Sequence, residues 1–178
     1  MSILKVARMG HPVLRARART VDKMEVKNSA IQQLIDSMID TMHEYSGVGL
    51  AAPQVHEGLR IFVAMLDADG RGEGDAIAFI NPEITVVGDV RVEGWEGCLS
   101  IPDVRGRVPR AQHVKISALD RHAKRFELEL RDFPARVVQH ENDHLDGVLF
   151  VDRMKSFESL TYIEEFSRYH TAQDDDDE

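Results

Sequence analysis

The first long segment with a clear apolar pattern is 28–47, NSAIQQLIDSMIDTMHEYSG. Its isoleucine, leucine and methionine residues recur at steps of three and four, which is the period of an amphipathic helix with one buried face. Asn28 or Ser29 can cap the first turn, and Gly47 can end the helix. We therefore predict a helix over this segment, and we interpret its methionine residues as core residues.

A second helix is predicted later in the chain, where polar and apolar positions mix on the same helical faces. Asp132 can serve as its N-cap, Pro134 fits the first turn, and Gly147 follows its last residue, Asp146. This frame places two histidines and a glutamate on the inward side of the helix. Buried His and Glu are unfavourable unless they are paired or bind a metal ion, so the helix is expected to face a polar partner.

Five shorter segments rich in β-branched and aromatic residues predict strands. The last three alternate in part between apolar and polar positions, as expected of antiparallel strands with one wet face. A third, peripheral helix is predicted over 156–169, SFESLTYIEEFSRY. The sequence thus predicts an α+β fold, with antiparallel strands wrapped around the central helix that begins at Asp132. The predicted strands are 60–66, 75–80, 83–92, 113–120 and 125–130.

The composition is typical of one globular domain, with 178 residues, 43% of them hydrophobic and 30% charged. The formal net charge is −9, but 174–178 (DDDDE) supplies five negative charges, so the rest of the chain carries only −4. We predict a single domain over 1–170 and a disordered acidic tail over 171–178. A mildly acidic domain gives no reason to expect direct nucleic-acid readout.

Neither a membrane segment nor a targeting segment is predicted. No apolar stretch approaches the roughly 20 residues that span a bilayer, and no secretory signal is present. Basic residues in the first 20 positions faintly resemble a transit peptide, but Pro12 interrupts them, so organellar targeting is not expected. The single cysteine, Cys98, cannot form an internal disulfide, which favours the reducing cytoplasm.

The strongest chemical signal is H-E-x-x-H at 140–144, within VVQHENDHLDG (137–147). On a helix, His140 and His144 lie on one face, with Cβ atoms roughly 5–6 Å apart. This arrangement with an intervening Glu141 is typical of zinc hydrolases. A catalytic metal of this type usually has three protein ligands and one open position, so one ligand has to come from elsewhere.

Three sources of the third ligand were considered from the residues. A histidine six positions after His144 is excluded, because Phe150 occupies that position. A glutamate from the predicted third helix would give a thermolysin-like site, although these look like surface carboxylates. Cys98 would give a Cys-His-His set, although a lone cysteine is usually a small buried residue. The candidate glutamates are Glu158, Glu164 and Glu165.

Three segments taken together resemble the peptide deformylase family. That family is marked by G-x-G-x-A-A-x-Q, E-G-C-x-S and Q-H-E-x-D-H-x-x-G, in this order, and all three patterns are intact. The resemblance covers most of 3–168 and includes two further short segments. The segments that carry it are GVGLAAPQ (47–54), EGCLS (96–100), QHENDHLDG (139–147), GHPVLR (10–15) and VPRA (108–111).

The resemblance implies a function and a set of site residues. The domain over 1–170 would be a catalytic hydrolase that removes the N-formyl group from N-terminal formylmethionine and releases formate. Cys98, His140 and His144 would bind the metal, and Glu141 would transfer the proton of a water molecule that the metal acidifies. Gln54 and the backbone N–H of Leu99 would stabilise the oxyanion.

Further residues are assigned by the same resemblance. Glu96 would orient a metal-binding histidine. The substrate would pair with backbone near two glycines as an added strand, and its methionine side chain would enter an apolar pocket. The glycines are Gly49 and Gly97, and the pocket residues are Val48, Phe133 and Val137. Trp95, where many relatives have Glu, and Arg136, where some have an aliphatic residue, are departures that affect substrate preference rather than chemistry.

The resemblance also implies one divalent metal ion per chain, Fe²⁺ in cells, with Zn²⁺, Ni²⁺ or Co²⁺ as alternatives. The expected partners are nascent formylmethionyl polypeptides and, transiently, the ribosome, in a bacterial-type cytoplasm. Two other functions stay open at this point. A zinc endopeptidase would use Glu164 or Glu165 as third ligand, and a catalytically silent relative would bind metal without turnover.

Overall fold

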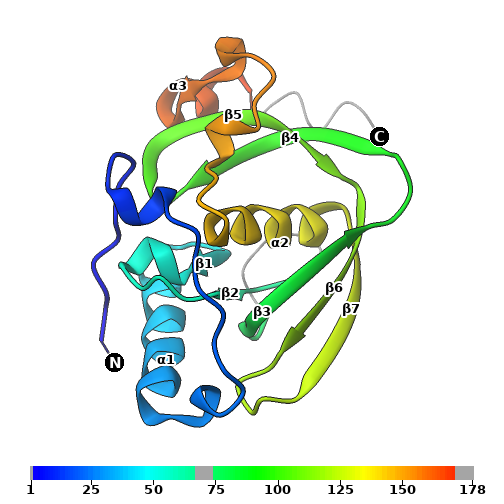
Figure 1. Cartoon of the computed structure of the whole chain (residues 1–178). Coiled ribbons are helices and arrows are strands. Elements are labelled where there is room, and N and C mark those ends of the chain that lie inside the picture. The colour runs from blue at the N-terminus through cyan, green and yellow to red at the C-terminus, as the bar shows by residue number, and fades with distance from the viewer. Residues whose placement is uncertain (1, 67–73, 171–178) are drawn as a thin grey trace.

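The computed structural model describes residues 2–66 and 74–170 (Figure 1). The predicted acidic tail, 171–178, lies outside the described residues. Besides short 3₁₀ turns, the described residues form three helices: α1 (Ser29–Glu44), α2 (Asp132–Leu145) and α3 (Ile163–Tyr169). The strands are β1 (Gly49–Ala51), β2 (Ile61–Ala64), β3 (Ile77–Val86), β4 (Arg91–Cys98), β5 (Ile101–Ala111), β6 (His113–Leu119), β7 (Arg125–Arg131) and β8 (Thr161–Tyr162).

The described strands form two antiparallel sheets around α2 (Figure 1). One has the order β1-β2-β3-β6-β7 and the other has the order β4-β5-β8. Ala135, Val138 and Leu145 of α2 share a core cluster with Phe62 and Phe79 of the larger sheet. The predicted α+β class, with antiparallel strands wrapped around a central helix, is confirmed. Strands β1 and β4 are each at one edge of their sheet, which matters for the site below.

Helix α1 covers one side of the larger sheet at its β1–β2 end (Figure 1). Its residues Ile35, Met38 and Met42 are fully buried and cluster with Ile61 and Val63 of β2. Burying each such side chain contributes roughly 1.5–3 kcal/mol to folding. The prediction that these methionines are core residues is confirmed. The helix ends at Glu44, earlier than predicted.

The segment 83–92 was wrongly predicted as one strand. Its first half completes β3, and its second half begins β4 after a turn in which Gly88 has φ of 72°. The predicted strand 75–80 belongs to the same β3, because the chain continues through a register shift between Ile80 and Glu83. Asn81, with φ of 51°, absorbs this bulge, and its side chain bonds the backbone of Val21 at 2.7 and 2.9 Å. These hydrogen bonds from the Asn81 side chain hold the chain in place at the bulge, so that β3 continues through it.

Strands β1 and β5, which both border the site, were not predicted. The 11-residue β5 is interrupted by prolines and a glycine and carries several arginines, so it lacks the apolar alternation of a strand. The three-residue β1 is too short to show the alternation of a strand, and β4 ends at Cys98. The predicted helix 156–169 is right in its second half, which is α3, and wrong in its first half. The first half contains a 3₁₀ turn at Phe157–Ser159 and the short strand β8.

The N-terminus of α2 also differs from the prediction. Arg131 is the N-cap residue, and Asp132 is the first helical residue, with φ of 54°. Asp132 instead binds the β5–β6 connection: its carboxylate accepts from Gln112 Nε2 at 2.9 Å, and its N–H donates to the Gln112 carbonyl at 2.8 Å. Within the described ranges, no helix is both long and apolar enough to cross a membrane.

Candidate active site

Helix α2 and the end of β4 bring three potential metal ligands together. One side-chain ligand atom each from Cys98, His140 and His144 lies within 4.8 Å of the others, and all three residues are buried. The Cys98 Sγ and His144 Nε2 atoms are 3.3 Å apart, and the two imidazole rings are 5.0 Å apart at an interplanar angle of 77°. One thiolate and two imidazoles form a donor set that suits zinc, iron or cobalt.

The other proposed third ligands do not join this group. Among the residues that the structure describes, Glu158, Glu164 and Glu165 lie outside the cluster of ligand atoms. Glu165 pairs with Arg168 on α3 at 3.0 Å, and Glu158 and Glu164 are exposed. The thermolysin-like arrangement is therefore not formed.

The electrostatics of the cluster favour an anionic sulfur. Burial raises the pKa of the Cys98 thiol, but His144 and His140 outweigh burial and lower this pKa well below its ordinary value. Burial lowers the pKa of His140, but Cys98 and Glu96 reverse this and raise it. Protons that prefer the imidazole to the sulfur leave a thiolate, the form in which cysteine binds metals. A metal ion bound by the thiolate and the imidazole would take the place of the imidazolium proton.

Glu96 fixes the orientation of His140. Its buried carboxylate lies 2.9 Å from His140 Nδ1, so the other ring nitrogen, Nε2, is left for a metal. Burial raises the pKa of Glu96, but His140 and Arg110 together lower it by more than burial raises it. The carboxyl group is therefore ionised. Arg110 donates to both carboxylate oxygens at 2.9 and 3.0 Å, and Arg136 donates at 2.8 Å.

This ionic network extends beyond the site, and sequence reasoning missed three of its members, Arg110, Asp143 and Arg153. Arg110 also pairs with Asp143 on α2, and Asp143 accepts a second pair of hydrogen bonds from Arg153. Arg110 lies in the unpredicted strand β5, so no local pattern marked it as buried. Arg136 spans β4 and β5 by donating to the carbonyls of Val92 and Val108 at 2.7 and 2.8 Å.

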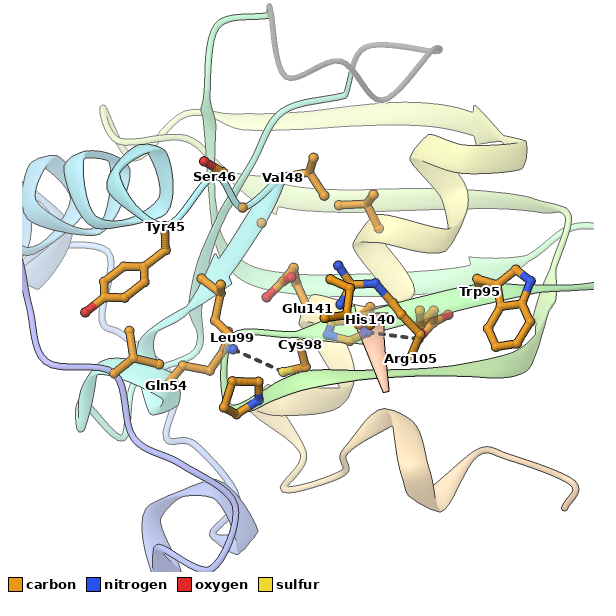
Figure 2. A pocket seen from close by; sticks show the side chains of 18 of the residues that line it. Tyr45, Ser46, Val48, Gln54, Trp95, Cys98, Leu99, Arg105, His140 and Glu141 are labelled. Carbon is orange, nitrogen blue, oxygen red and sulfur yellow. Dashed lines mark hydrogen bonds and ion pairs between the residues drawn. The ribbon is translucent and has the colours of Figure 1, made fainter. Parts of the chain in front are cut away.

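Glu141 is buried next to the metal-ligand cluster, and it lines the cleft (Figure 2). Burial raises its pKa to about 7, although His140 and His144 oppose this. Its Oε2 atom has no hydrogen-bond partner among the described residues. A carboxylate that titrates near neutrality and has a free oxygen can take up and return a proton.

Gln54 is held rigidly on the other side of Cys98 (Figure 2). Its Oε1 accepts from the Ala51 N–H at 2.8 Å, which fixes the direction of the amide. Its Nε2 then lies 3.5 Å from Cys98 Sγ and 3.3 Å from Ser100 Oγ. Leu99 follows Cys98 in the turn after β4 and also lines the cleft.

A cleft of about 780 Å³ opens over these groups. The two edge strands β1 and β4 and helix α2 contribute to its lining, so the cleft runs between the two sheets. The predicted residues that line it are Val48, Gly49, Gln54, Glu96, Gly97, Cys98, Leu99, Phe133, Val137, His140 and Glu141. His144 is buried and is not among the lining residues. Further lining residues are Trp95 of β4, Arg105 of β5, Arg136 of α2 and Ile163 of α3.

Both glycines predicted beside the substrate leave no free room for a Cβ. A Cβ at Gly49 would lie 2.5 Å from Glu141 Oε1, and a Cβ at Gly97 would lie 1.7 Å from Arg105 Nη1. Neither position can carry a side chain without displacing its neighbour. The lack of a Cβ therefore lets the backbone of β1 lie close to Glu141 and the backbone of β4 lie close to Arg105.

The fold and the cleft define a class of protein, the metal-dependent hydrolases with a Cys-His-His site, a buried carboxylate and an open cleft between sheet edges. The comparisons identify the family: the model of the polypeptide deformylase family matches residues 3–159. The chain belongs to this family, which consists of enzymes.

Several relatives and solved structures to which this chain is similar are named peptide deformylases. Peptide deformylase 2 of Nostoc sp. is 41% identical over 173 residues, covering 95% of this chain and 96% of the relative. Peptide deformylase of Salinibacter ruber is 44% identical, covering 87% and 82%. The class I type b peptide deformylase of Acinetobacter baumannii with Met-Ala-Ser bound superposes with a TM-score of 0.80 at 41% identity, covering 86% of this chain and 100% of that one. The Thermotoga maritima enzyme gives a TM-score of 0.80 at 37% identity, covering 88% and 100%.

Proposed function

We propose that this chain hydrolyses the N-formyl group of formylmethionine at the N-terminus of newly made polypeptides, giving formate and a free amine. The observation that carries the proposal is the Cys98, His140 and His144 cluster with Glu141 beside it, open to a cleft between two sheet edges. The similar Acinetobacter baumannii enzyme has been solved with Met-Ala-Ser bound, a peptide with a free N-terminal methionine.

Cys98, His140 and His144 would hold one divalent metal ion, Fe²⁺ in cells, with Zn²⁺, Ni²⁺ or Co²⁺ as replacements. The fit is supported by the thiolate character of Cys98, by the engagement of His140 Nδ1 with Glu96, and by the short separation of the donor atoms. When bound, such an ion supplies Lewis acidity to water and to the formyl carbonyl.

Glu141 is assigned the proton transfer. Its carboxylate takes the proton of the attacking water and delivers it to the amine nitrogen as the C–N bond breaks. The pKa of about 7 and the unpartnered Oε2 suit both steps, because the group can be a base first and an acid afterwards. Gly49, by lacking a Cβ, leaves the carboxylate in position.

The formyl oxygen, which becomes negatively charged, is assigned to the Gln54 amide and the backbone N–H of Leu99. The bond from Ala51 to Gln54 Oε1 turns the NH₂ group toward Cys98 before any substrate arrives. Donors that are fixed in advance stabilise a developing charge without reorganisation, and each contributes roughly 3–4 kcal/mol.

The edges of β1 and β4 are assigned to the substrate backbone. Both strands line the cleft as sheet edges, and an extended peptide can add to such an edge through main-chain hydrogen bonds. Gly49 and Gly97 would be the points of closest approach. The methionine side chain would lie against Val48, Phe133 and Val137, which form an apolar part of the cleft lining.

The proposal also covers a partner and a cellular location. The substrate is a nascent polypeptide, so we infer a transient contact with the ribosome and a cytoplasmic location of the bacterial type. Residues 1–170 would act as one catalytic domain. The bacterial relatives and the reduced, metal-binding role of the single cysteine support this setting.

The deciding assay is anaerobic release of formate from formyl-Met-Ala-Ser by the iron-loaded protein. Formate and a new amino terminus should appear in equal amounts, and acetyl-Met-Ala-Ser should react far more slowly. Metal binding without formate release would favour the silent relative. Cleavage of internal bonds in an unformylated peptide would favour an endopeptidase.

A further inference from the structure

The two residues assigned to the formyl oxygen come from different sheets. Gln54 follows β1, an edge strand of the five-stranded sheet, and Leu99 follows β4, an edge strand of the three-stranded sheet. Within the part of the chain that the structure describes, the two sheets share no strand. The register of a sheet therefore does not set the distance between the two donors, although both have to meet one oxygen atom.

Leu99 lies at the free end of a long hairpin. Cys98 of β4 pairs with Ile101 of β5, so Leu99 and Ser100 form the two-residue turn between these strands. The chain enters and leaves the hairpin at its other end. Because β4 is eight residues long, that end is roughly 25 Å from the turn. A donor in this turn needs a further contact that fixes its position relative to Gln54.

The N-terminal segment makes such a contact. The Ala7 N–H donates to the Gln54 carbonyl at 2.7 Å, and the Met9 N–H donates to the Ser100 carbonyl at 2.7 Å. The two N–H groups are two residues apart in the chain, so they are separated by at most about 7 Å. Residues 7–9, which we name the N-terminal strap, thus connect the chain at Gln54 to the turn that contains Leu99.

The N-terminal strap is held on the side that precedes it. The Leu4 N–H donates to Thr41 Oγ1 of α1 at 2.9 Å, and Figure 1 shows the N-terminal segment passing beside this helix. Ala7 is buried in the same core cluster as Cys98. The strap is therefore packed against the site and does not lie loosely on the surface.

A tight turn follows the N-terminal strap. The His11 N–H donates to the Arg8 carbonyl at 3.0 Å, across Met9 and Gly10. Gly10 has φ of 106°, which is typical of the third residue of a type II turn. Met9 is then the second residue of this turn, and its N–H is left to bind Ser100.

A side-chain hydrogen bond supports the same connection. Gln54 Nε2 is 3.3 Å from the hydroxyl oxygen of Ser100, which is fully buried. Gln54 is thus linked to the strap through its carbonyl and to the hairpin turn through its amide. Figure 2 shows Gln54 and Leu99 next to each other beside Cys98.

We propose that the N-terminal strap is a positioning element of the active site, which holds the Gln54 amide and the Leu99 N–H at the separation that the formyl oxygen requires. The inference rests on the proposed deformylase activity and adds a role for residues 7–9 in it. Without the Met9 hydrogen bond, the hairpin turn can move and carry one donor away. Complete loss of such a donor lowers kcat by about 10²–10³-fold, so a displaced donor should lower it about tenfold.

Met9→Pro tests the hydrogen bond without changing the shape of the turn. Proline fits the second residue of a type II turn and has no N–H. Met9→Ala is the reference, because it also lacks the methionine side chain but keeps the N–H. At equal metal content, kcat for formyl-Met-Ala-Ser should be about tenfold lower in Met9→Pro than in Met9→Ala, with little change in KM.

The affinity for Met-Ala-Ser should be equal in these two variants, because this product lacks the formyl oxygen. Equal kcat values would overturn the proposal. A loss of metal or of Met-Ala-Ser affinity in Met9→Pro would also overturn it, because the strap would then have a general structural role.

Gly10→Ala perturbs the strap from the neighbouring turn. A Cβ at Gly10 meets nothing within 4 Å, so the substitution strains only the backbone. Gly88 also has a positive φ and free space, and it lies in the turn between β3 and β4, which makes Gly88→Ala the matched control. Gly10→Ala should lower kcat, whereas Gly88→Ala should keep the wild-type value. Equal kcat values in the two variants would overturn the proposal.

Amide NMR spectra of the zinc-loaded protein give a measurement that does not depend on turnover. Relative to Met9→Ala, Met9→Pro should shift the backbone amide signal of Leu99 and the side-chain amide signals of Gln54. The signals of β7, at the opposite edge of the sheet from β1, should not shift. Unshifted Leu99 and Gln54 signals would overturn the positioning role. Shifted signals without deformylation in the wild type would support that role and refute the proposed activity alone.

Discussion

Gly49 and Glu141 are so close that a Cβ at position 49 would displace the Glu141 side chain. A Cβ there would lie 2.5 Å from Glu141 Oε1 and 2.8 Å from two of its carbon atoms. The first residue of β1 thus determines where the buried carboxylate of α2 lies. The positions of the two elements in the fold, and not a hydrogen bond, keep Glu141 beside the metal-ligand cluster.

Gly49→Ala should lower kcat strongly while the metal content stays at one ion per chain. The added methyl group pushes the Glu141 carboxylate aside, and a misplacement of about 1 Å can lower the rate by about 10²-fold. Metal analysis and formate release on the same preparation check this. Gly58→Ala is the matched control, because a Cβ at Gly58 meets nothing within 4 Å, and its activity should equal that of the wild type.

Glu141→Gln should retain the metal but lose turnover. The amide keeps the size of the side chain and cannot accept a proton, so kcat should fall by roughly 10²–10⁴-fold. The affinity for Met-Ala-Ser should change little, because the amide occupies the same volume. Wild-type kcat in a fully metal-loaded variant would assign the proton transfer to another group.

Helix α1 could be predicted because its apolar residues follow a helical period over four turns, and α2 because Pro134 and Gly147 mark its two ends. Strand β5 could not be predicted, since Pro102, Gly106 and Pro109 break its alternation and its inward residues include a charged one. Its stability comes from pairing with β4 along most of its length, which is a long-range property. The short β8 was missed for the same reason, because it exists only through its pairing with β5.

In the site, too, residues with a local sequence pattern could be predicted and residues joined by long-range contacts could not. His140, Glu141 and His144 share one helix, so spacing alone indicated a metal site. Cys98 is 42 residues away from the nearest of them, and only the resemblance to a family selected it over the glutamates. The bridge from Glu96 through Arg110 to Asp143 had no local signal, because it joins β4, β5 and α2.

Cys98→Ser should lose most of its bound metal. A hydroxyl group is a harder ligand than a thiol and a much weaker acid. The variant therefore lacks the anionic sulfur that the two histidines favour at this position. Metal content after gel filtration should fall to a small fraction, with His122→Ala, at an exposed histidine, unchanged. Full occupancy together with normal deformylation in Cys98→Ser would contradict the Cys-His-His assignment.

Asp152→Asn should destabilise the fold at pH 7, and this effect should shrink as the pH falls below the unfolded pKa of about 3.9. Asp152 pairs with Arg15 and accepts from the Leu149 N–H at 2.8 Å, and Arg15 is the main cause that lowers the pKa of this carboxyl in the folded state. A depressed folded pKa gives stability above the unfolded pKa, about 3.9, and this stability is lost as the pH falls through the folded value. Because the pair is partly exposed, the difference at pH 7 should be about 1 kcal/mol or less.

Guanidinium denaturation of wild type and Asp152→Asn at pH 7, 5, 4 and 3, in the same metal state, measures this difference directly. The gap between the two free energies of unfolding should be constant from pH 7 to pH 5 and then shrink. Asp89→Asn, at an exposed aspartate in the turn between β3 and β4, is the control. A gap that stays constant down to pH 3 would show that Asp152 stabilises the junction after α2 by its shape and hydrogen bonding, and not by its charge.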